Sequence, residues 1–160
     1  MAFFSRTGTT RRLAEHIARA IGAELEELKE TRSRLGLWGW VRSGYEGTYR
    51  RPATVLPLHC NLGDYDIVFI GSPTWNRALA SPVRGFLEQY ASELSHVDVA
   101  LFATCQGQGA SDVLEQMSAL LKKPPLATLA MLESDVRSGP AVQVGELSEA
   151  ALRAWETSEG

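Results

Sequence analysis

The amino-acid sequence predicts an α/β fold in which helices cover both faces of a five-stranded parallel sheet. Apolar runs of strand length alternate along the chain with stretches whose apolar residues recur at helical spacing, which is the pattern of a doubly wound sheet. The clearest run, 67–70, is continuously apolar and ends at Gly71-Ser72-Pro73, as expected for a strand that is buried on both faces. A length of 160 residues is usual for one domain, so we expect a single domain over 1–160.

The amino-terminal elements are a short strand, an amphipathic helix and a second strand. Residues 2–4 are apolar and form the first strand. Apolar residues four positions apart then mark the buried stripe of a helix, which Gly22 ends as a carboxyl-terminal cap. Residues 23–28 alternate apolar residues with glutamate, which favours a strand covered on one face. The stripe of the helix consists of Leu13, Ile17 and Ile21.

The same alternation continues after the third strand. Pro82 begins a helix in its first turn, where the missing N–H costs nothing. Ser111 or Asp112 caps the helix that follows the fourth strand, and Pro124-Pro125 stops it. The expected elements of this half are a fourth strand over 97–105, a fifth strand over 126–132 and a last helix over 147–155.

The connection between the second and third strands, residues 31–57, is longer than connections in such folds usually are. Leu37, Trp38, Val41 and Tyr45 share one helical face within it, although four nearby glycines weaken a helix there. This apolar stripe either packs on the sheet or forms a flap over a ligand. We favour packing.

Composition and charge exclude several classes of protein. The chain is 44% hydrophobic and 22% charged, which is typical of a globular domain, and its net charge of −3 provides little attraction for nucleic acid. No stretch approaches the roughly 18–20 apolar residues of a membrane span, and no basic-then-apolar leader opens the chain. Cys60 and Cys105 have no C-x-x-C spacing, so neither a metal site nor a disulfide is indicated. We expect a cytoplasmic protein.

The strongest functional motif is the loop Ser5-Arg6-Thr7-Gly8-Thr9-Thr10, which lies between the first strand and the first helix. The unsatisfied N–H groups of a helix start, together with its dipole, favour an anion. The hydroxyl groups can add hydrogen bonds, and Gly8 lets the backbone approach a phosphate closely. The alternative is an ordinary Ser/Thr helix cap. Without the lysine of a G-x-x-x-x-G-K-[ST] loop, triphosphate hydrolysis is not supported.

At these residues the sequence resembles the flavodoxin family, whose phosphate loop reads [ST]-x-T-G-x-T. Two further segments resemble the family in the same order. Gly71-Ser72-Pro73-Thr74-Trp75-Asn76, followed by residues 81–87, is similar to the flavin-ring loop of short-chain flavodoxin-like oxidoreductases. Residues 103–109 are similar to the family's loop after the fourth strand. The resemblance implies a three-layer sandwich with strand order 2-1-3-4-5, and it implies that all three loops meet at the carboxyl ends of the strands.

The resemblance implies an FMN cofactor. Trp75 would stack on or edge the isoalloxazine ring, or else pack in the core. Backbone groups of Thr74, Asn76 and Gly107 would meet the polar edge of the ring, although Asn76 is equally a turn former. The cofactor-binding residues implied are Ser5, Arg6, Thr7, Gly8, Thr9, Thr10, Pro73, Thr74, Trp75, Asn76, Cys105, Gln106 and Gly107.

The function implied is an oxidoreductase that exchanges electrons or hydride between a donor such as NAD(P)H and a small acceptor such as a quinone. The chain lacks the strong acidity of family electron carriers and the aromatic residue that many of them hold after the fourth strand. One flavin face is therefore expected to be open. The alternatives are an FMN electron carrier that docks on redox partners, and the same fold without flavin. A homo-oligomer is compatible with the sequence.

Only four residues precede the phosphate loop, where a strand of about five or six is usual. If the start is truncated or misassigned, the first strand is under-paired and Ser5 is poorly anchored, and we expect FMN affinity to rise when the missing strand residues are restored before Met1. An unchanged dissociation constant would contradict this.

Overall fold

The computed structural model describes residues 1–30 and 52–158. Its described strands are β1 (Ala2–Phe3), β2 (Glu26–Glu27), β3 (Ile67–Trp75), β4 (Ala78–Leu79), β5 (Asp98–Cys105) and β6 (Thr128–Leu132). The sheet has the order β2-β1-β3-β5-β6, and β4 is an antiparallel addition to β3. The main strands all run parallel. Counted along the chain without β4, their order is 2-1-3-4-5, which confirms the predicted fold class.

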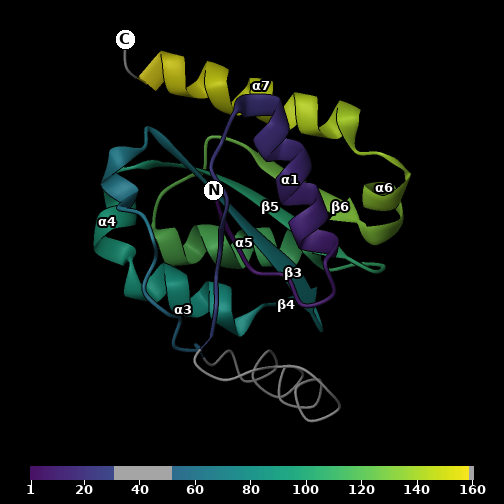
Figure 1. Ribbon diagram of the computed structural model, residues 1–160, viewed down its shortest axis with the longest axis horizontal. Helices are drawn as coiled ribbons and strands as arrows, with labels where there is room; N and C mark the ends of the chain where they lie inside the picture. The colour runs from purple at the N-terminus through teal and green to yellow at the C-terminus, as the bar shows by residue number, and fades with distance from the viewer. Residues whose placement is uncertain (31–51, 159–160) are drawn as a thin grey trace.

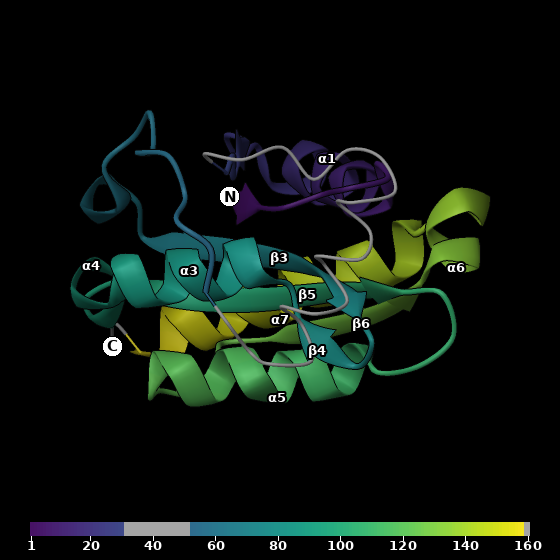
Figure 2. The same cartoon turned by 90° about the horizontal axis from the view of Figure 1, so that it is seen from below.

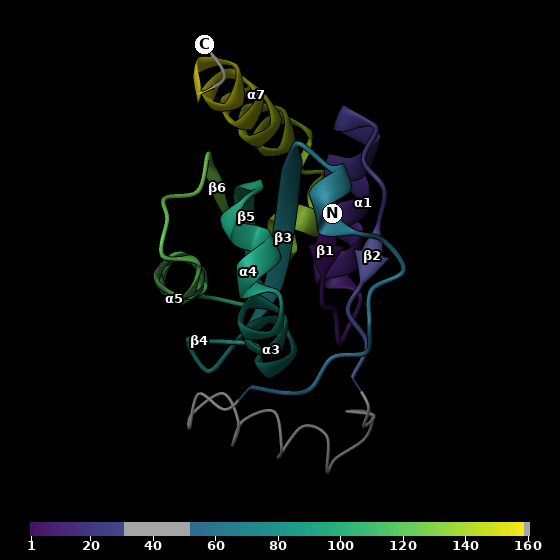
Figure 3. The same ribbon diagram turned by 90° about the vertical axis from the view of Figure 1, so that its left-hand side faces the viewer.

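Helices cover both faces of this sheet (Figure 1). The described helices are α1 (Thr9–Ile21), α3 (Ser81–Gln89), α4 (Ala91–Ser95), α5 (Ala110–Leu121), α6 (Glu133–Ser138) and α7 (Ala141–Ser158), with a 3₁₀ turn, η1 (Leu62–Asp64). One face packs against α1 and α7 through Leu13 and Leu147, and the other packs against α3 and α5 through Phe86 and Met117. Figure 3 shows these two helical layers on either side of the sheet. None of the described helices is long and apolar enough to cross a membrane.

The first strand is only two residues long but is bonded on both sides. Ala2 and Phe3 each pair with β2 on one side and with β3 on the other. The Phe4 N–H then donates to the Gly71 carbonyl at 3.2 Å. Strand β1 is therefore not under-paired over these two residues, because the middle of the sheet provides neighbours on both sides. The rise in FMN affinity on restoring residues before Met1 stays a prediction. The helix that follows ends at Gly22, whose φ of 67° confirms the predicted cap.

The third strand is longer than predicted. The sequence suggested that it ends at Gly71-Ser72-Pro73, whereas β3 continues to Trp75 and turns back into β4. Pro73 is tolerated because its ring nitrogen faces the same side as the Gly71 carbonyl, where β1 has already ended. A two-residue turn follows, in which Asn76 and Arg77 have φ values of 49° and 59°. This is the geometry of a type I′ hairpin, so Asn76 is a turn residue.

The carboxyl-terminal helices also differ from the prediction. Gly109 begins α5 in a left-handed conformation with φ 98°, and no side chain caps this helix. The predicted cap at Ser111 or Asp112 is therefore wrong, and the Asp112 carboxylate instead accepts from Arg77 Nε at 2.8 Å. The last helix, α7, extends beyond the predicted 147–155 at both ends. The short elements α4, α6 and β4 were missed, because a few residues are too short to display a period.

The predicted long connection 31–57 is described only from residue 52, so its apolar stripe lies outside the described residues. Its last part runs along α3. The Ala53 N–H donates to the Ser81 carbonyl at 3.0 Å, and a Cβ built on Gly85 would lie 1.8 Å from the Ala53 carbonyl oxygen. A side chain at position 85 would therefore separate this segment from the helix.

Candidate functional site

Three segments that are far apart in the sequence meet at the carboxyl edge of the sheet. The Arg6 guanidinium carbon lies over the Trp75 ring, 5.8 Å from its centroid, which joins the loop after β1 to the end of β3. The hydroxyl oxygens of Thr10 and Thr104 lie 2.8 Å apart, which joins the start of α1 to β5. Figure 2 shows the start of α1 and α6 at one end of the sheet, and α4 at the other. The expected meeting of the three segments is therefore found.

The loop from Ser5 to Thr10 is held open by its own hydrogen bonds. The Gly8 N–H donates to Ser5 Oγ at 3.1 Å, and the Arg12 N–H donates to the Gly8 carbonyl at 2.9 Å as the first bond of α1. Gly8 has a φ of 93°, and a Cβ built on it would meet nothing within 4 Å. The first turn of α1 contains no acidic residue. The positive end of the helix dipole therefore faces open space, and the first turn of α1 itself holds no carboxylate that would compete with an anion.

The hydroxyl groups of this loop do not all face outward. Thr10 is 1% exposed, and its hydroxyl is engaged with the buried Thr104. The Ser5 hydroxyl oxygen already accepts the Gly8 N–H, and Thr9 is buried. Thr7 is exposed. In this arrangement Ser5 and Thr10 shape the loop, and the N–H groups of the helix start are its main donors toward an anion.

A small pocket of about 190 Å³ lies against this loop. Thr7, Gly8 and Thr9, for which the sequence predicts a role in anion binding, line one side of it. The other side is lined by three residues that sequence reasoning missed: Arg12, Val136 and Arg137. The last two belong to α6, which is too short to be read from periodicity. Arg12 could have been predicted from the sequence. It lies one turn into α1, and a cation at that position is close to an anion bound at the start of the helix.

Trp75 lies in the hydrophobic core at the end of β3. It is 6% exposed, and its ring meets the Phe4 ring edge-on with centroids 5.6 Å apart. The guanidinium of Arg6 lies over the indole. The sequence left core packing and ligand stacking open for Trp75. In the described structure the indole packs in the core, and a planar ligand would reach its face only after Arg6 has moved.

The residue before this tryptophan carries an unsatisfied polar atom. Thr74 Oγ1 is buried, and no hydrogen-bond partner for it is found among the described residues. Buried hydroxyl groups without a partner are rare and costly, so this atom is a candidate ligand contact. Of the other predicted residues, Asn76, Gln106 and Gly107 are exposed, whereas Cys105 is buried in the core and Pro73 is half-buried in the strand.

The loop after β5 packs closely on the β3–β4 turn. A Cβ built on Gly109 would lie 3.0 Å from Cα of Arg77, so a side chain there would push the two loops apart. Gln116 fastens the same turn by donating from Nε2 to the Arg77 carbonyl at 3.1 Å. With the ion pair between Arg77 and Asp112, these contacts hold the second and third segments together.

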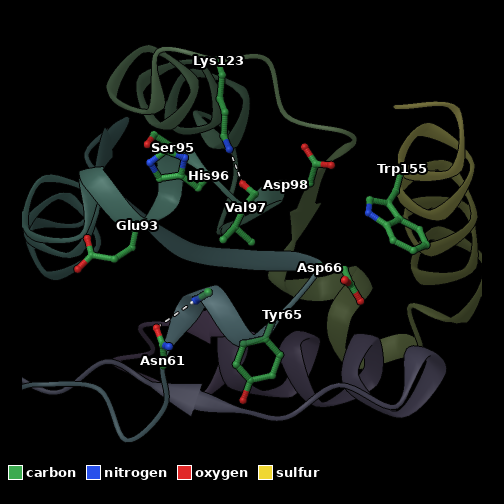
Figure 4. A pocket seen from close by; sticks show the side chains of 11 residues that line it. Asn61, Tyr65, Asp66, Glu93, Ser95, His96, Val97, Asp98, Lys123 and Trp155 are labelled. Carbon is green, nitrogen blue, oxygen red and sulfur yellow. Dashed lines mark hydrogen bonds between the residues drawn. The ribbon is translucent and has the colours of Figure 1, made fainter. Parts of the chain in front are cut away.

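A larger pocket of about 550 Å³ lies at the opposite edge of the sheet, by the amino ends of β3 and β5 (Figure 4). Asp66, Glu93 and Asp98 line it. Lys123 donates from Nζ to the Val97 carbonyl, and burial lowers the pKa of this lysine. A phosphate there would meet mainly carboxylates. None of the residues predicted for the site lines this pocket, and ligands of open α/β sheets bind at the carboxyl edge.

Comparisons with known proteins agree with this geometry. A family model described as flavodoxin matches residues 1–138. A search of curated proteins finds no match. The chain is similar to a crystal structure from Bacteroides eggerthii assigned as a flavoprotein, with 26% identity and a TM-score of 0.70, over 88% of this chain and 94% of that one.

Two more distant structures share the fold. A flavoprotein from Lactobacillus acidophilus, solved in complex with FMN, is 21% identical with a TM-score of 0.64, over 86% of this chain and 94% of that one. An NADH:FMN oxidoreductase, solved in its apo form, is 14% identical with a TM-score of 0.56, over 98% of this chain and 87% of that one.

Proposed function

The chain belongs to the flavodoxin family, and on this premise we propose that it binds FMN and transfers electrons or hydride from a donor such as NAD(P)H to a small acceptor such as a quinone. The observation that supports this most is that three loops meet beside the start of α1, whose N–H groups and dipole favour an anion. The related fold of an NADH:FMN oxidoreductase supports a nicotinamide donor.

The residues present fit a flavin mononucleotide in two respects. The start of α1 provides unsatisfied N–H groups and no carboxylate, and Arg12 and Arg137 line the pocket beside it, which suits a phosphate dianion. At the other end, the buried Thr74 hydroxyl has no hydrogen-bond partner among the residues that the structure describes, which suits the polar edge of the isoalloxazine. One group of contacts thus holds a charge, and the other orients a planar ring.

Each part of the site has its own task in this proposal. The loop N–H groups and the two arginines hold the phosphate. Thr74, together with backbone groups of Asn76 and Gly107, orients the ring, and the core around Trp75 keeps water from one side of it. When bound, FMN supplies the hydride and electron chemistry. The described residues of the site therefore need to provide no acid–base pair.

Two measurements test this proposal: a fluorescence titration that measures FMN binding, and an assay of NAD(P)H turnover. The purified protein, titrated with FMN, is expected to quench flavin fluorescence at a one-to-one ratio, and the holoprotein is expected to oxidise NAD(P)H steadily when a quinone is present. A protein that takes up no FMN overturns the proposal. A protein that binds FMN but turns over no donor with any acceptor is an electron carrier instead of an enzyme.

A further inference from the structure

Arg6 is a cation of the phosphate loop whose guanidinium contacts an aromatic ring outside the pocket of that loop. It does not line the pocket beside the loop, and its guanidinium lies over the Trp75 ring at 5.8 Å. It makes no ion pair with any carboxylate in the described parts of the chain. A half-buried arginine without a carboxylate partner, resting on an aromatic ring, is held there mainly by the cation–π attraction.

From this contact we infer that Arg6 makes the site selective for the phosphorylated flavin over riboflavin. The inference rests on the proposed function and deepens it. A guanidinium and an isoalloxazine cannot lie on the same face of one indole. A flavin that uses the Trp75 face must therefore displace Arg6, and the displaced cation belongs to the loop that holds the phosphate.

The two flavins meet this arginine differently. Riboflavin breaks the cation–π contact and offers the guanidinium nothing in return. FMN breaks the same contact but offers a phosphate dianion, with which arginine forms charge-assisted and often bidentate hydrogen bonds. Arg6 therefore weakens the binding of riboflavin and strengthens the binding of FMN. In this way one side chain both closes the ring face and recognises the phosphate.

The strengths of the two interactions set the expected effects. A cation–π contact of about 0.5–1 kcal/mol corresponds to about a two- to fivefold change in affinity. A hydrogen bond to a charged group is stronger, and its loss costs about tenfold or more. Removing the guanidinium is thus expected to shift the two affinities in opposite directions. A residue with only a structural role would shift them in the same direction.

The experiment measures the dissociation constants of FMN and riboflavin for the full chain, by quenching of flavin fluorescence and by calorimetry. Arg6→Ala is expected to bind riboflavin about two- to fivefold more tightly and FMN at least about tenfold more weakly. Arg6→Lys keeps the charge but not the planar fork, so it is expected to restore most of the FMN affinity. The matched control is Arg19→Ala, which removes an exposed arginine from the last turn of α1, the helix that follows the loop of Arg6.

The result that overturns the inference is a ratio of FMN to riboflavin affinity that Arg6→Ala leaves unchanged, whether both affinities fall together or neither moves. Urea unfolding of each variant shows that it is folded. The two proposals fail in distinguishable ways. A wild-type protein that binds neither flavin removes both, whereas wild-type binding of FMN with an unchanged ratio in the variant removes only the role of Arg6.

Discussion

Two buried threonine hydroxyls near the carboxyl edge differ in whether they have a partner. Thr104 Oγ1 shares a hydrogen bond with Thr10, whereas no partner for Thr74 Oγ1 is found in the described ranges. A buried hydroxyl without a partner lowers the stability of the flavin-free protein, and it becomes favourable when a ligand atom reaches it. The presence or absence of a hydrogen-bond partner thus distinguishes Thr104, a structural residue, from Thr74, a candidate binding residue.

Thr74→Val is therefore expected to have opposite effects on stability and on binding. The isosteric change removes the unsatisfied hydroxyl, so the free energy of unfolding of the flavin-free protein should rise by about 1 kcal/mol. FMN affinity should fall by about fivefold because a ligand contact is lost. Urea unfolding and flavin titration measure the two effects. The matched control Thr104→Val should instead destabilise by about 1–3 kcal/mol, because it leaves the Thr10 hydroxyl buried alone.

Tyr65 gives a pH-dependent contribution to stability. Its hydroxyl donates to the Glu24 carboxylate, and this hydrogen bond raises the pKa of Tyr65 from 10.0 to about 12. The folded state thus holds the phenol proton more tightly than the unfolded state does. The contribution is complete below pH 10.0 and is lost as the pH rises toward about 12.

The expected result is that unfolding free energy falls more steeply in the wild type than in Tyr65→Phe over this alkaline window. The comparison with the variant cancels the titration of lysines, which deprotonate in the same range. Urea unfolding at a series of alkaline pH values measures the difference, and ultraviolet titration of the phenolate gives the pKa directly. Parallel curves for the two proteins would show that the bond to Glu24 does not persist in solution.

At the scale of elements, the start of α1 is both a helix terminus and the edge of the site. A negative charge near this terminus favours the helix but repels a bound phosphate. Arg12 lies one turn into the helix and lines the pocket beside the loop. Arg12→Glu is therefore expected to stabilise the flavin-free protein by about 0.3–1 kcal/mol and to weaken FMN binding at least about tenfold.

The control for this change lies at the other end of the helix. Arg19 is in the last turn, where a positive charge is favourable. Its Nη2 atom lies 3.5 Å from Oε2 of Glu15. Arg19→Glu should destabilise the protein slightly and leave FMN binding as it is. Thermal unfolding and flavin titration separate the two variants. Equal effects of both on FMN affinity would mean that overall charge, and not the terminus of α1, attracts the phosphate.

The elements that the sequence predicts best are those whose burial leaves a long apolar pattern. The run 67–70 and the four-residue spacing of Leu13 and Ile17 identify β3 and α1, because a whole face of each is buried. The sequence could not show that β3 continues to Trp75, since Gly71 and Pro73 are ordinary stop signals. They are tolerated because the ring of Phe102 fills the space of a Cβ at position 71 and β1 has ended beside Pro73.

The residues of the candidate site also differ in whether the sequence alone could predict them. The loop around Gly8 is one continuous segment, and its motif was visible in the sequence. Arg137 and Val136 come from a helix of six residues that reaches the loop only through the fold, and no local pattern marks them. The contact of Arg6 with Trp75 likewise depends on the separation of two strand ends. A contact between distant segments carries no periodic signal, so its prediction requires the topology.

At the scale of the whole molecule, the two halves of the core depend on the same strands. Val99 and Leu101 of β5 face one cluster, while Ala100 and Phe102, which alternate with them, face the other. If one helical layer detached, it would therefore expose one apolar face of the same strands on whose other face the second layer packs. Because the faces of a strand alternate, we propose that residues 1–160 form one cooperative domain.

This proposal predicts that the helices on opposite faces open together. In hydrogen exchange, the slowest amides of α5 and α7 should report the same free energy, equal to that of global unfolding in urea. FMN at about 100 times its dissociation constant should raise both values by about 2.7 kcal/mol, although α7 does not line the pocket beside the phosphate loop. In the flavin-free protein the short α6 serves as an internal comparison, because its amides are expected to open locally at lower free energy. If FMN protected α5 while α7 kept its original exchange rates, the two layers would be separate units and the single-domain proposal would be wrong.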